Sequence, residues 1–440
     1  MMKAPSGGVF RVMKKVREMN IKEALEFMEA ASWRGSILGL DRMYILMEKL
    51  GNPHEKLKFI HVAGTNGKGS TSAMLSAILT AAGYKTGLYT SPHLIRYNER
   101  FKINDEDISD EELCEIAEAV KTASDTMRDQ CIPTVFERIT AMAFYWFAKQ
   151  QCDFVILEVG MGGRLDATNI IKKPELSIIC NIDLEHTEEL GDTIEKIAFE
   201  KGGIIKPGAP VLLYAQSEAV ENVIKGLCTE RGCDLTVTDP EKAESVSRST
   251  DGQVFSYRDR KNIRLRLTGS YQLMNALTVA DAADVLKKTY EIPEEAVYAG
   301  FANVKWPGRF EVLAKDPYIL LDGAHNPNGV RELARCLADY FPDKKFTFVF
   351  GVMADKDHED MLRAIAPYAE SFIAVTPKSE RALASSSLKN EIEEMLGLPT
   401  YDACSVEEGL DQALELRNGG ANICIFGSLY QAGDVLNYFN

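Results

Sequence analysis

The segment from Gly64 to Ser70 constrains the fold of this chain more than any other feature. Its residues are Gly64, Thr65, Asn66, Gly67, Lys68, Gly69 and Ser70. An apolar run over residues 58–63 precedes it, and a helical pattern over residues 69–82 follows it. Glycines between a strand and a helix let backbone N–H groups approach phosphate oxygens, and the helix N-terminus favours negative charge. We therefore predict a phosphate-binding loop, against the alternative of a glycine-rich turn with an incidental lysine.

The loop departs from the usual pattern G-x-x-x-x-G-K-[ST], in which a hydroxyl residue follows the lysine and helps to hold Mg²⁺. Here two residues separate the glycines, and Gly69 follows Lys68. Ser70 comes one position later, where we expect it only to donate to phosphate. Ligands for a metal ion should therefore also come from elsewhere in the chain.

The rest of the chain alternates apolar runs with helical patterns. Runs without polar alternation are typical of parallel strands covered on both faces. These runs occupy residues 58–63, 86–90, 153–158, 176–183 and 210–214, and, after Trp306, residues 318–321, 345–350, 371–375 and 422–426. Residues 236–267 instead alternate apolar and polar side chains, which indicates a small antiparallel excursion.

These patterns predict an α/β protein of two domains. Residues 1–303 should form a P-loop-type ATP-binding domain with a mostly parallel sheet and the antiparallel excursion. Residues 304–440 should form a smaller Rossmann-like α/β domain. Met19 begins a clean amphipathic run, so residues 1–18 are interpreted as a mobile extension or as the result of a misplaced start.

Composition excludes several kinds of protein. The formal net charge of −15 disfavours a nucleic-acid partner. No apolar stretch approaches the roughly 18–20 residues that cross a bilayer, so we expect no membrane partner. The nine cysteines form no C-x-x-C pair, which indicates reduced thiols and a cytoplasmic protein.

The missing metal ligands are predicted at the carboxyl ends of the other strands, where ligands collect in open α/β sheets. Ser91 follows the run 86–90, Glu158 ends the run 153–158, and His186 follows the run 176–183. A hydroxyl, a carboxylate and an imidazole near the phosphates form a Mg²⁺ site, although imidazole is a less common ligand for this ion. The alternatives are a turn or cap residue for the serine and the histidine, and an exposed surface position for the glutamate.

The order of motifs along the chain resembles the folylpolyglutamate synthase/dihydrofolate synthase family, within the Mur-ligase-type amide ligases. The motifs are GTNGKGS, TSPHL, ERF, LEVGMGGRLDATN, H-x-x-x-LG, EKGGIIK, Q-x-x-N, PGRFE, DGAHNP and GSLY, and they extend from about residue 20 to the end. The resemblance implies that ATP phosphorylates a carboxylate to an acyl phosphate, which the amine of L-glutamate then attacks. The C-terminal domain is then the glutamate-binding domain, and the family suggests a monomer.

The resemblance also implies residue roles. Lys68 holds the β- and γ-phosphates, one Mg²⁺ lies at Ser91 and Glu158, and a second lies at Glu158 and His186. Lys201 is implied to be carbamylated, so that it becomes a metal ligand, and a monovalent cation is a further implied cofactor. The catalytic set is therefore Lys68, Glu158, His186 and Lys201. The alternative for Lys201 is a surface lysine at a helix end.

Further implied contacts concern the substrates. The nucleotide contacts are Asn275, with Gln272 nearby, for the base, Arg309 for phosphate, and Asp322 for ribose or a cation. The glutamate contacts are His325 and Ser428, and the folate contacts are Arg100, Phe136 and Glu137. The alternatives are a buried, internally bonded Asn275, a loop hydrogen bond for His325 and a core position for Phe136.

Three hypotheses about function compete. The first is glutamate ligation to a reduced folate, to dihydropteroate, or to both. The second is an amide ligase for a cell-wall precursor, which the TSPHL and ERF motifs weaken. The third is a non-catalytic nucleotide switch, which would leave DGAHNP without a role and lacks an N-K-x-D guanine motif.

Overall fold

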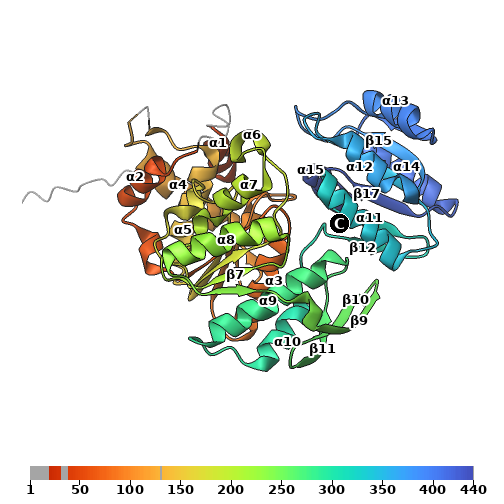
Figure 1. The fold of residues 1–440 in the computed structure, drawn as a ribbon. Coiled ribbons are helices and arrows are strands. Elements are labelled where there is room, and N and C mark those ends of the chain that lie inside the picture. Colours follow the sequence, from red (N-terminus) through yellow and green to blue (C-terminus); the bar gives the residue numbers. More distant parts are fainter. Residues whose placement is uncertain (1–18, 31–37, 129–130, 440) are drawn as a thin grey trace, which may run out of the picture.

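The computed structural model describes residues 19–30, 38–128 and 131–439. The interpretation of residues 1–18 lies outside the described residues. We call the described residues 19–303 the large lobe and residues 311–439 the small lobe; residues 304–310 connect them. Figure 1 shows the small lobe, in blue, beside the large lobe, with the strands β9, β10 and β11 below it in the view.

The large lobe is built on an eight-stranded sheet with the order β4-β3-β2-β5-β1-β6-β7-β8. The strands are β1 Phe59–Ala63, β2 Thr86–Tyr89, β3 Phe101–Ile103, β4 Glu106–Asp107, β5 Phe154–Glu158, β6 Leu176–Ile179, β7 Val211–Leu213 and β8 Leu235–Val237. The six strands from β2 to β8 in this order are parallel, whereas β3 and β4 pair antiparallel at one edge. Every residue of β1 and of β5 is buried, as expected for strands covered on both faces.

The register of the central strands aligns their carboxyl ends. Val62 of β1 pairs with Glu158 of β5, and Ala63 pairs with Ile179 of β6. Tyr89, the last residue of β2, pairs with Leu157 of β5. The loops that follow these four strands therefore leave the sheet at the same edge.

The helices of the large lobe follow their local signals. They are α1 Ile21–Glu29, α2 Asp41–Lys49, α3 Lys68–Ala81, α4 Asp110–Ser124, α5 Val135–Lys149, α6 Thr187–Leu190, α7 Ile194–Lys201, α8 Glu218–Arg231, α9 Tyr271–Lys287 and α10 Glu294–Asn303. The first turn of α5 carries a capping box in which Thr134 and Glu137 bond each other's backbone N–H. The N-cap of α4 is Ser109, which accepts from the Glu112 backbone.

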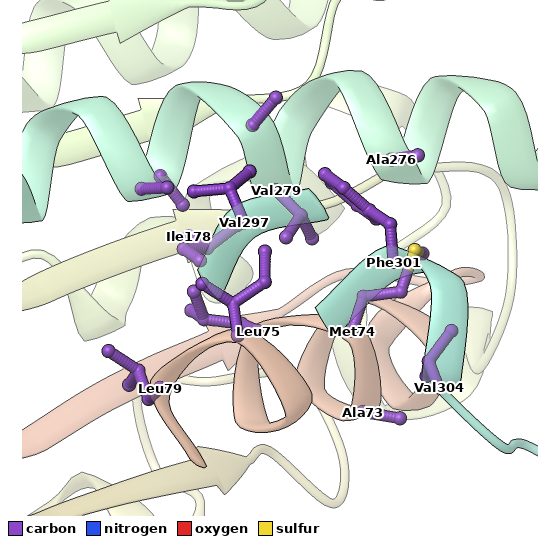
Figure 2. Close-up of a cluster of buried hydrophobic side chains, with 14 of the residues drawn as sticks. Ala73, Met74, Leu75, Leu79, Ile178, Ala276, Val279, Val297, Phe301 and Val304 are labelled. Carbon is purple, nitrogen blue, oxygen red and sulfur yellow. The ribbon is translucent and has the colours of Figure 1, made fainter. Parts of the chain in front are cut away.

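The antiparallel excursion is a three-stranded sheet of β9 Ala243–Ser249, β10 Gly252–Tyr257 and β11 Arg260–Leu265. A hydrophobic core joins this sheet to α3, α9 and α10. Figure 2 shows Met74 and Leu75 of α3 facing Val279 of α9 and Phe301 of α10. The helix that follows the phosphate loop is thus anchored from behind by apolar packing.

The small lobe contains a six-stranded sheet with the order β12-β13-β17-β14-β15-β16, in which only β12 runs antiparallel. The strands are β12 Glu311–Ala314, β13 Ile319–Leu321, β14 Phe346–Phe350, β15 Ala369–Val375, β16 Thr400–Ala403 and β17 Ile423–Phe426. The helices are α11 Pro327–Tyr340, α12 His358–Ile365, α13 Ser385–Leu396, α14 Val406–Asn418 and α15 Leu429–Phe439.

The predicted α/β fold class is confirmed. The chain contains a large, mostly parallel sheet with helices, a small antiparallel sheet, and a second, mostly parallel sheet with its own helices. The sequence patterns missed the edge strands β3, β4, β8, β12 and β16, because short, half-exposed strands carry no continuous apolar run. The domain boundary between residues 303 and 304 stays a prediction. No helix in the described part of the chain is long and apolar enough to cross a membrane.

Candidate active site

The Gly64–Ser70 loop connects β1 to α3, and α3 begins at Lys68. The Thr65 backbone N–H donates to the carbonyl of Asn181 at 2.6 Å, which ties the loop to the segment after β6. Lys68 Nζ donates to the carbonyl oxygens of Gly64 and Thr65 at 3.0 and 3.1 Å. The ammonium group therefore lies folded against its own loop, at the N-terminus of a helix whose dipole favours an anion.

Gly69, the departure from the usual loop pattern, has a steric cause in this structure. A Cβ atom at Gly69 would lie 2.6 Å from Cζ2 of Trp306, which belongs to the connection between the lobes. A serine or threonine at this position therefore needs Trp306 to move.

Glu158 and Ser91 meet at the ends of β5 and β2. Glu158 is 4% exposed, so the alternative of a surface position is wrong. The Ser91 backbone N–H donates to Glu158 Oε2 at 3.0 Å. Burial raises the pKa of the Glu158 carboxyl, while Lys68 and the Ser91 N–H act in the opposite direction. A buried carboxylate in this setting gains stability from a cation.

His186 and Lys201 lie beside the same loop. His186 precedes α6 with a φ of 51°, and burial lowers the pKa of its imidazole. Lys201 ends α7, is 3% exposed and donates from Nζ to the Gly64 carbonyl at 2.8 Å. The alternative of a surface lysine is therefore wrong. Burial and the neighbouring Lys68 lower the pKa of Lys201 to about 7, so a substantial fraction is neutral near pH 7.

Asn275 and Gln272 lie on α9 next to the loop. Asn275 Nδ2 donates to Gln272 Oε1 at 3.0 Å, and Gln272 Nε2 donates to Ser70 Oγ at 3.1 Å. Asn275 lines the cavity described below, whereas Gln272 is completely buried behind it. Asn275 therefore makes the internal hydrogen bond that was given as its alternative, and it also lines the cavity.

Asp322 follows β13 in the small lobe and is held rigidly. Its carboxylate accepts hydrogen bonds from the hydroxyl of Tyr271 at 2.9 Å and from the backbone N–H groups of Phe310 and Ala324, each at 2.7 Å. Burial raises the pKa of this carboxyl, and Arg309 opposes the shift. Arg309 belongs to the connection between the lobes, so a phosphate contact from Arg309 would link the two lobes.

His325 and Ser428 occupy different surroundings. His325 Nδ1 lies 2.8 Å from the Gly323 carbonyl oxygen, which is the loop hydrogen bond given as its alternative, and its ring also lines the cavity. Burial lowers the pKa of His325. Ser428 is 3% exposed, and its hydroxyl accepts from the Tyr430 N–H at 3.2 Å. Ser428 does not line the cavity in this structure.

A cavity of about 260 Å³ lies between the lobes and gathers most of the predicted residues. The predicted residues that line it are Thr65, Asn66, Gly67, Lys68, Gly69, Ser70, Ser91, Glu158, His186, Asn275, Arg309, Asp322 and His325. Gly64, Lys201 and Gln272 support this lining from behind. Residues from widely separated strand ends therefore meet around one space.

The predicted folate contacts lie outside this lining. Arg100 donates from Nε to His93 Nδ1 at 2.9 Å. Glu137 is 3% exposed and pairs with Arg42 at 2.9 Å, in addition to capping α5. The ring of Phe136 packs against Gly160, which lines the cavity, and joins the core of the large lobe, as its alternative predicted.

A second cavity of about 410 Å³ adjoins the first. Both are lined by Gly69, Ser91, Pro92, Glu158, Arg309 and Leu429. The second cavity adds the apolar side chains of Leu94, Ile95, Trp306 and Leu436, the basic side chains of Arg96, Lys102 and Lys305, and the acidic side chains of Glu99, Asp105 and Asp107. Arg96 and Lys102 pair with Asp107, whereas Arg309 lines both cavities. A molecule with an apolar body and a carboxylate at one end therefore fits here with its carboxylate toward Arg309 and the first cavity.

The protein alone does not form a complete metal site. Among residues 19–30, 38–128 and 131–439, no three His, Cys, Asp or Glu side chains are grouped to hold a metal ion. Mg²⁺ usually keeps several waters and takes one or two carboxylates together with phosphate oxygens. The buried carboxylate of Glu158, next to Ser91 and the phosphate loop, fits that mode of binding.

The sequence patterns missed several residues that line the cavity from both lobes. They are Glu185, Asn326, Asn328, Tyr271, Tyr214 and Glu332. Glu185 carried a usable signal, because it directly precedes His186 after a strand. Asn326 and Asn328 bond to Glu185 and Asn66, 141 and 262 positions away, so no local pattern marks these two contacts.

Two family models match this chain. The Mur ligase middle domain matches residues 62–283, and the Mur ligase, glutamate ligase domain matches residues 308–429. The first match covers the phosphate loop, Glu158, His186, Lys201 and Asn275. The second covers Arg309, Asp322, His325 and Ser428.

Individual relatives cover nearly the whole chain. The chain is 34% identical to the dihydrofolate synthase/folylpolyglutamate synthase of Bacillus subtilis, over 93% of this chain and 98% of that protein. The structure of Mycobacterium tuberculosis folylpolyglutamate synthase complexed with ADP and AMPPCP superposes with a TM-score of 0.88 at 31% identity, covering 96% and 99% of the two chains. The structure of E. coli FolC in complex with DHPP and ADP gives a TM-score of 0.83 at 29% identity, covering 95% and 97%.

Proposed function

The chain belongs to the folylpolyglutamate synthase/dihydrofolate synthase family of Mur-type ligases, and we propose on this basis which residues perform its ATP-dependent ligation of L-glutamate to folate. One observation carries the assignment of residues. Lys68, Ser91, Glu158 and His186, from four strand ends of the large lobe, line one cavity opposite His325 of the small lobe. ATP on the large lobe and glutamate on the small lobe would then reach the same cavity.

ATP binds with its phosphates on the Gly64–Ser70 loop. Loop N–H groups and Lys68 bind the β- and γ-phosphates, which draw the Lys68 ammonium away from the Gly64 and Thr65 carbonyls. Asn275 contacts the base, and Gln272 positions Asn275 and Ser70 through its two hydrogen bonds. Arg309 binds phosphate oxygens, and the fixed carboxylate of Asp322 binds ribose hydroxyls or a cation.

Mg²⁺ would be held by Ser91 and Glu158, and a second Mg²⁺ by Glu158 and His186. The ions would supply charge neutralisation as the γ-phosphoryl group moves. The lowered pKa of His186 keeps the imidazole neutral, as a metal ligand must be. A monovalent cation is a further proposed cofactor.

Lys201 is proposed to react with CO₂. The neutral amine attacks the carbon of CO₂, an N–C bond forms, and the nitrogen loses one proton to give a carbamate. The pKa of about 7 supplies the neutral amine that this addition needs. The carbamate adds a negative charge next to the Gly64 carbonyl, where Lys201 Nζ now lies 2.8 Å away.

The acceptor is proposed to lie in the second cavity, with its carboxylate toward Glu158 and Arg309. Phe136, Glu137 and Arg100 remain proposed folate contacts, with Phe136 reaching the site only through Gly160. L-Glutamate is proposed to bind at His325, with Ser428 as a second contact that requires a rearrangement of the Ser428 loop.

The proposed reaction has two steps. An oxygen of the acceptor carboxylate attacks the γ-phosphorus, an O–P bond forms, and the bond to the β–γ bridging oxygen breaks to release ADP. The amine of glutamate then attacks the acyl carbon, a C–N bond forms, and phosphate leaves with the electrons of the broken C–O bond. The ammonium loses one proton before the attack and one after it. Closure of the lobes around the cavity excludes water from the acyl phosphate.

Product mass analysis tests this proposal. The protein is incubated with ATP, Mg²⁺ and L-glutamate, with tetrahydrofolate, with dihydropteroate, or without an acceptor. Acceptor-dependent ADP and phosphate, with a mass gain of one glutamyl unit, support it. Product only from dihydropteroate makes dihydrofolate synthesis the main activity, and slow hydrolysis without acceptor dependence supports a nucleotide switch instead.

We also propose a monomeric, cytoplasmic protein. All nine cysteines are free thiols, which favours a reducing compartment. Light scattering checks the monomer and fractionation checks the compartment. A dimer, or a membrane-bound or secreted protein, would contradict these two proposals.

A further inference from the structure

The incoming amino acid poses a recognition problem that the residues assigned above do not solve. At neutral pH it carries an ammonium group, which needs a negatively charged or carbonyl acceptor when it leaves water. His325 can contact a carboxylate or a neutral group but adds no negative charge. A carboxylate with an unoccupied oxygen beside His325 meets this need and also offsets the positive charge.

Four carboxylates line the cavity between the lobes: Glu158, Glu185, Asp322 and Glu332. Asp322 is saturated by three hydrogen bonds. Glu332 pairs with Arg335 on the same helix at 3.2 Å. Glu158 faces Ser91 and Lys68, the position needed for phosphate and metal. Elimination leaves Glu185.

The geometry of Glu185 suits this role. Its Oε1 accepts from Asn326 Nδ2 at 3.0 Å and lies 3.9 Å from His325 Nε2. Its Oε2 has no hydrogen-bond partner within the part of the chain that the structure describes. Its side chain is 13% exposed, so a cation that pairs with it is largely shielded from water. The carboxylate thus comes from the large lobe but touches the small-lobe residue proposed to bind glutamate.

We propose that Glu185 binds the ammonium group of the incoming amino acid and so selects an amine-bearing substrate over a plain dicarboxylate. The proposal rests on the proposed function, since it names a binding residue for the same reaction. Because the carboxylate belongs to the large lobe, the amino acid that it binds bridges the lobes at His325. The ammonium is thereby held on the side of the cavity that carries the phosphate loop.

The test compares L-glutamate with glutarate, which has both carboxylates but no amine. In Glu185→Gln, the KM for L-glutamate should rise about 10- to 100-fold, as expected for losing a charge-assisted hydrogen bond. The inhibition constant of glutarate and the KM for ATP should stay within about twofold, because neither ligand pairs with this carboxylate. Glu185→Asp keeps the charge and should recover part of the affinity for L-glutamate.

Glu332→Gln is the matched control, since it removes a carboxylate of the same cavity that is already paired, and it should leave the KM for L-glutamate unchanged. If Glu185→Gln weakens the binding of L-glutamate, glutarate and ATP equally, Glu185 serves only as a contact between the lobes. That result would overturn the proposal. An unchanged KM for L-glutamate would also overturn it. If Glu185→Gln fails to fold, Glu185→Asp is compared with the wild type instead. The deciding quantity is then the KM for L-glutamate divided by the inhibition constant of glutarate. Failure of the proposed function is distinguishable, because wild-type protein would then form no glutamyl product.

Discussion

At the scale of single residues, charged groups converge on one carbonyl oxygen. Lys68 and Lys201 both donate to Gly64, at 3.0 and 2.8 Å. Two ammonium groups at one acceptor repel each other, and burial together with this repulsion lowers the pKa of Lys201 to about 7. The arrival of phosphates would draw Lys68 toward the anion and leave the carbonyl to Lys201.

Lys68→Ala and Glu158→Ala should each reduce ligation by about 10²-fold or more, since each removes a charge that faces the transferred phosphoryl group. Folding should be preserved, because removing the buried Glu158 carboxyl, whose pKa burial raises, relieves a desolvation cost, and Lys68 bonds to carbonyls of its own loop. Product formation and circular dichroism check the two parts. Normal turnover in either variant would remove the phosphate and metal roles.

The buried His61 should make the protein sensitive to mild acid. Burial lowers its pKa from 6.5 to about 3, and its Nε2 contacts Thr168 Oγ1 at 2.8 Å. Between these values the unfolded chain binds a proton that the folded chain does not, so stability is lost as the pH falls below 6.5. This contribution amounts to about 2 kcal/mol between pH 8 and pH 5.

His61→Gln should keep a hydrogen bond to Thr168 but lose the titration. The free energy of unfolding from urea melts should therefore fall less between pH 8 and pH 5 than in the wild type. Parallel pH profiles of the two proteins would show that His61 does not contribute.

At the scale of elements, the site depends on how closely the loop after β5 approaches the end of α7. A Cβ at Gly203 would lie 2.3 Å from Arg164 Cβ and 2.7 Å from its backbone nitrogen. The Arg164 N–H donates to the Glu200 carbonyl at 2.8 Å, so the two segments touch through their backbones. This contact places Lys201 next to the phosphate loop.

Gly203→Ala should separate these segments and destabilise the protein by about 1–3 kcal/mol, the usual cost of overpacking. Its KM for ATP should also rise, because Lys201 and the loop shift together. Thermal melts and ATP kinetics measure both effects.

Gly226→Ala is the control for Gly203→Ala. Gly226 is exposed within α8, and an added Cβ there would meet nothing within 4 Å. Alanine should stabilise the helix by about 0.5–1 kcal/mol. A loss of stability equal to that of Gly203→Ala would contradict the explanation by close approach.

At the scale of the whole molecule, polar contacts join the two lobes across the cavity. Asn66 of the phosphate loop donates to Asn328 Oδ1 of α11 at 2.7 Å, and Asn326 donates to Glu185 at 3.0 Å. Single hydrogen bonds of this kind contribute about 1 kcal/mol each, so they can break and form again as substrates enter. The lobes are therefore linked strongly enough to align the site and weakly enough to open.

Asn66→Ala and Asn328→Ala test this link. Each variant should raise the KM for ATP about 3- to 10-fold, since each removes the same bond of about 1 kcal/mol. The KM for ATP of the double variant should be no higher than that of the more impaired single variant, because the effects of two residues that share one contact are not additive. Additive losses in the KM for ATP would show that the two asparagines act independently.

What the sequence by itself determined is local. Helix α5, Val135–Lys149, is encoded locally, because its capping box and its apolar run lie within the same 16 residues. The phosphate loop, Glu158 and His186 were predictable because the loop directly follows a buried strand, Glu158 ends another, and His186 lies in the segment after a third. Parallel strands that share one edge necessarily bring their following residues together.

What only the tertiary structure decided depends on contacts between distant segments. Glu137 pairs with Arg42, and Glu185 accepts a hydrogen bond from Asn326, at separations that no pattern spans. Ser428 does not line the cavity. A side chain at Gly69 would contact Trp306, more than 200 positions away. Periodicity and capping fix which elements form, because their energies come from neighbouring residues. The partner of a side chain in the site is fixed only when the lobes pack.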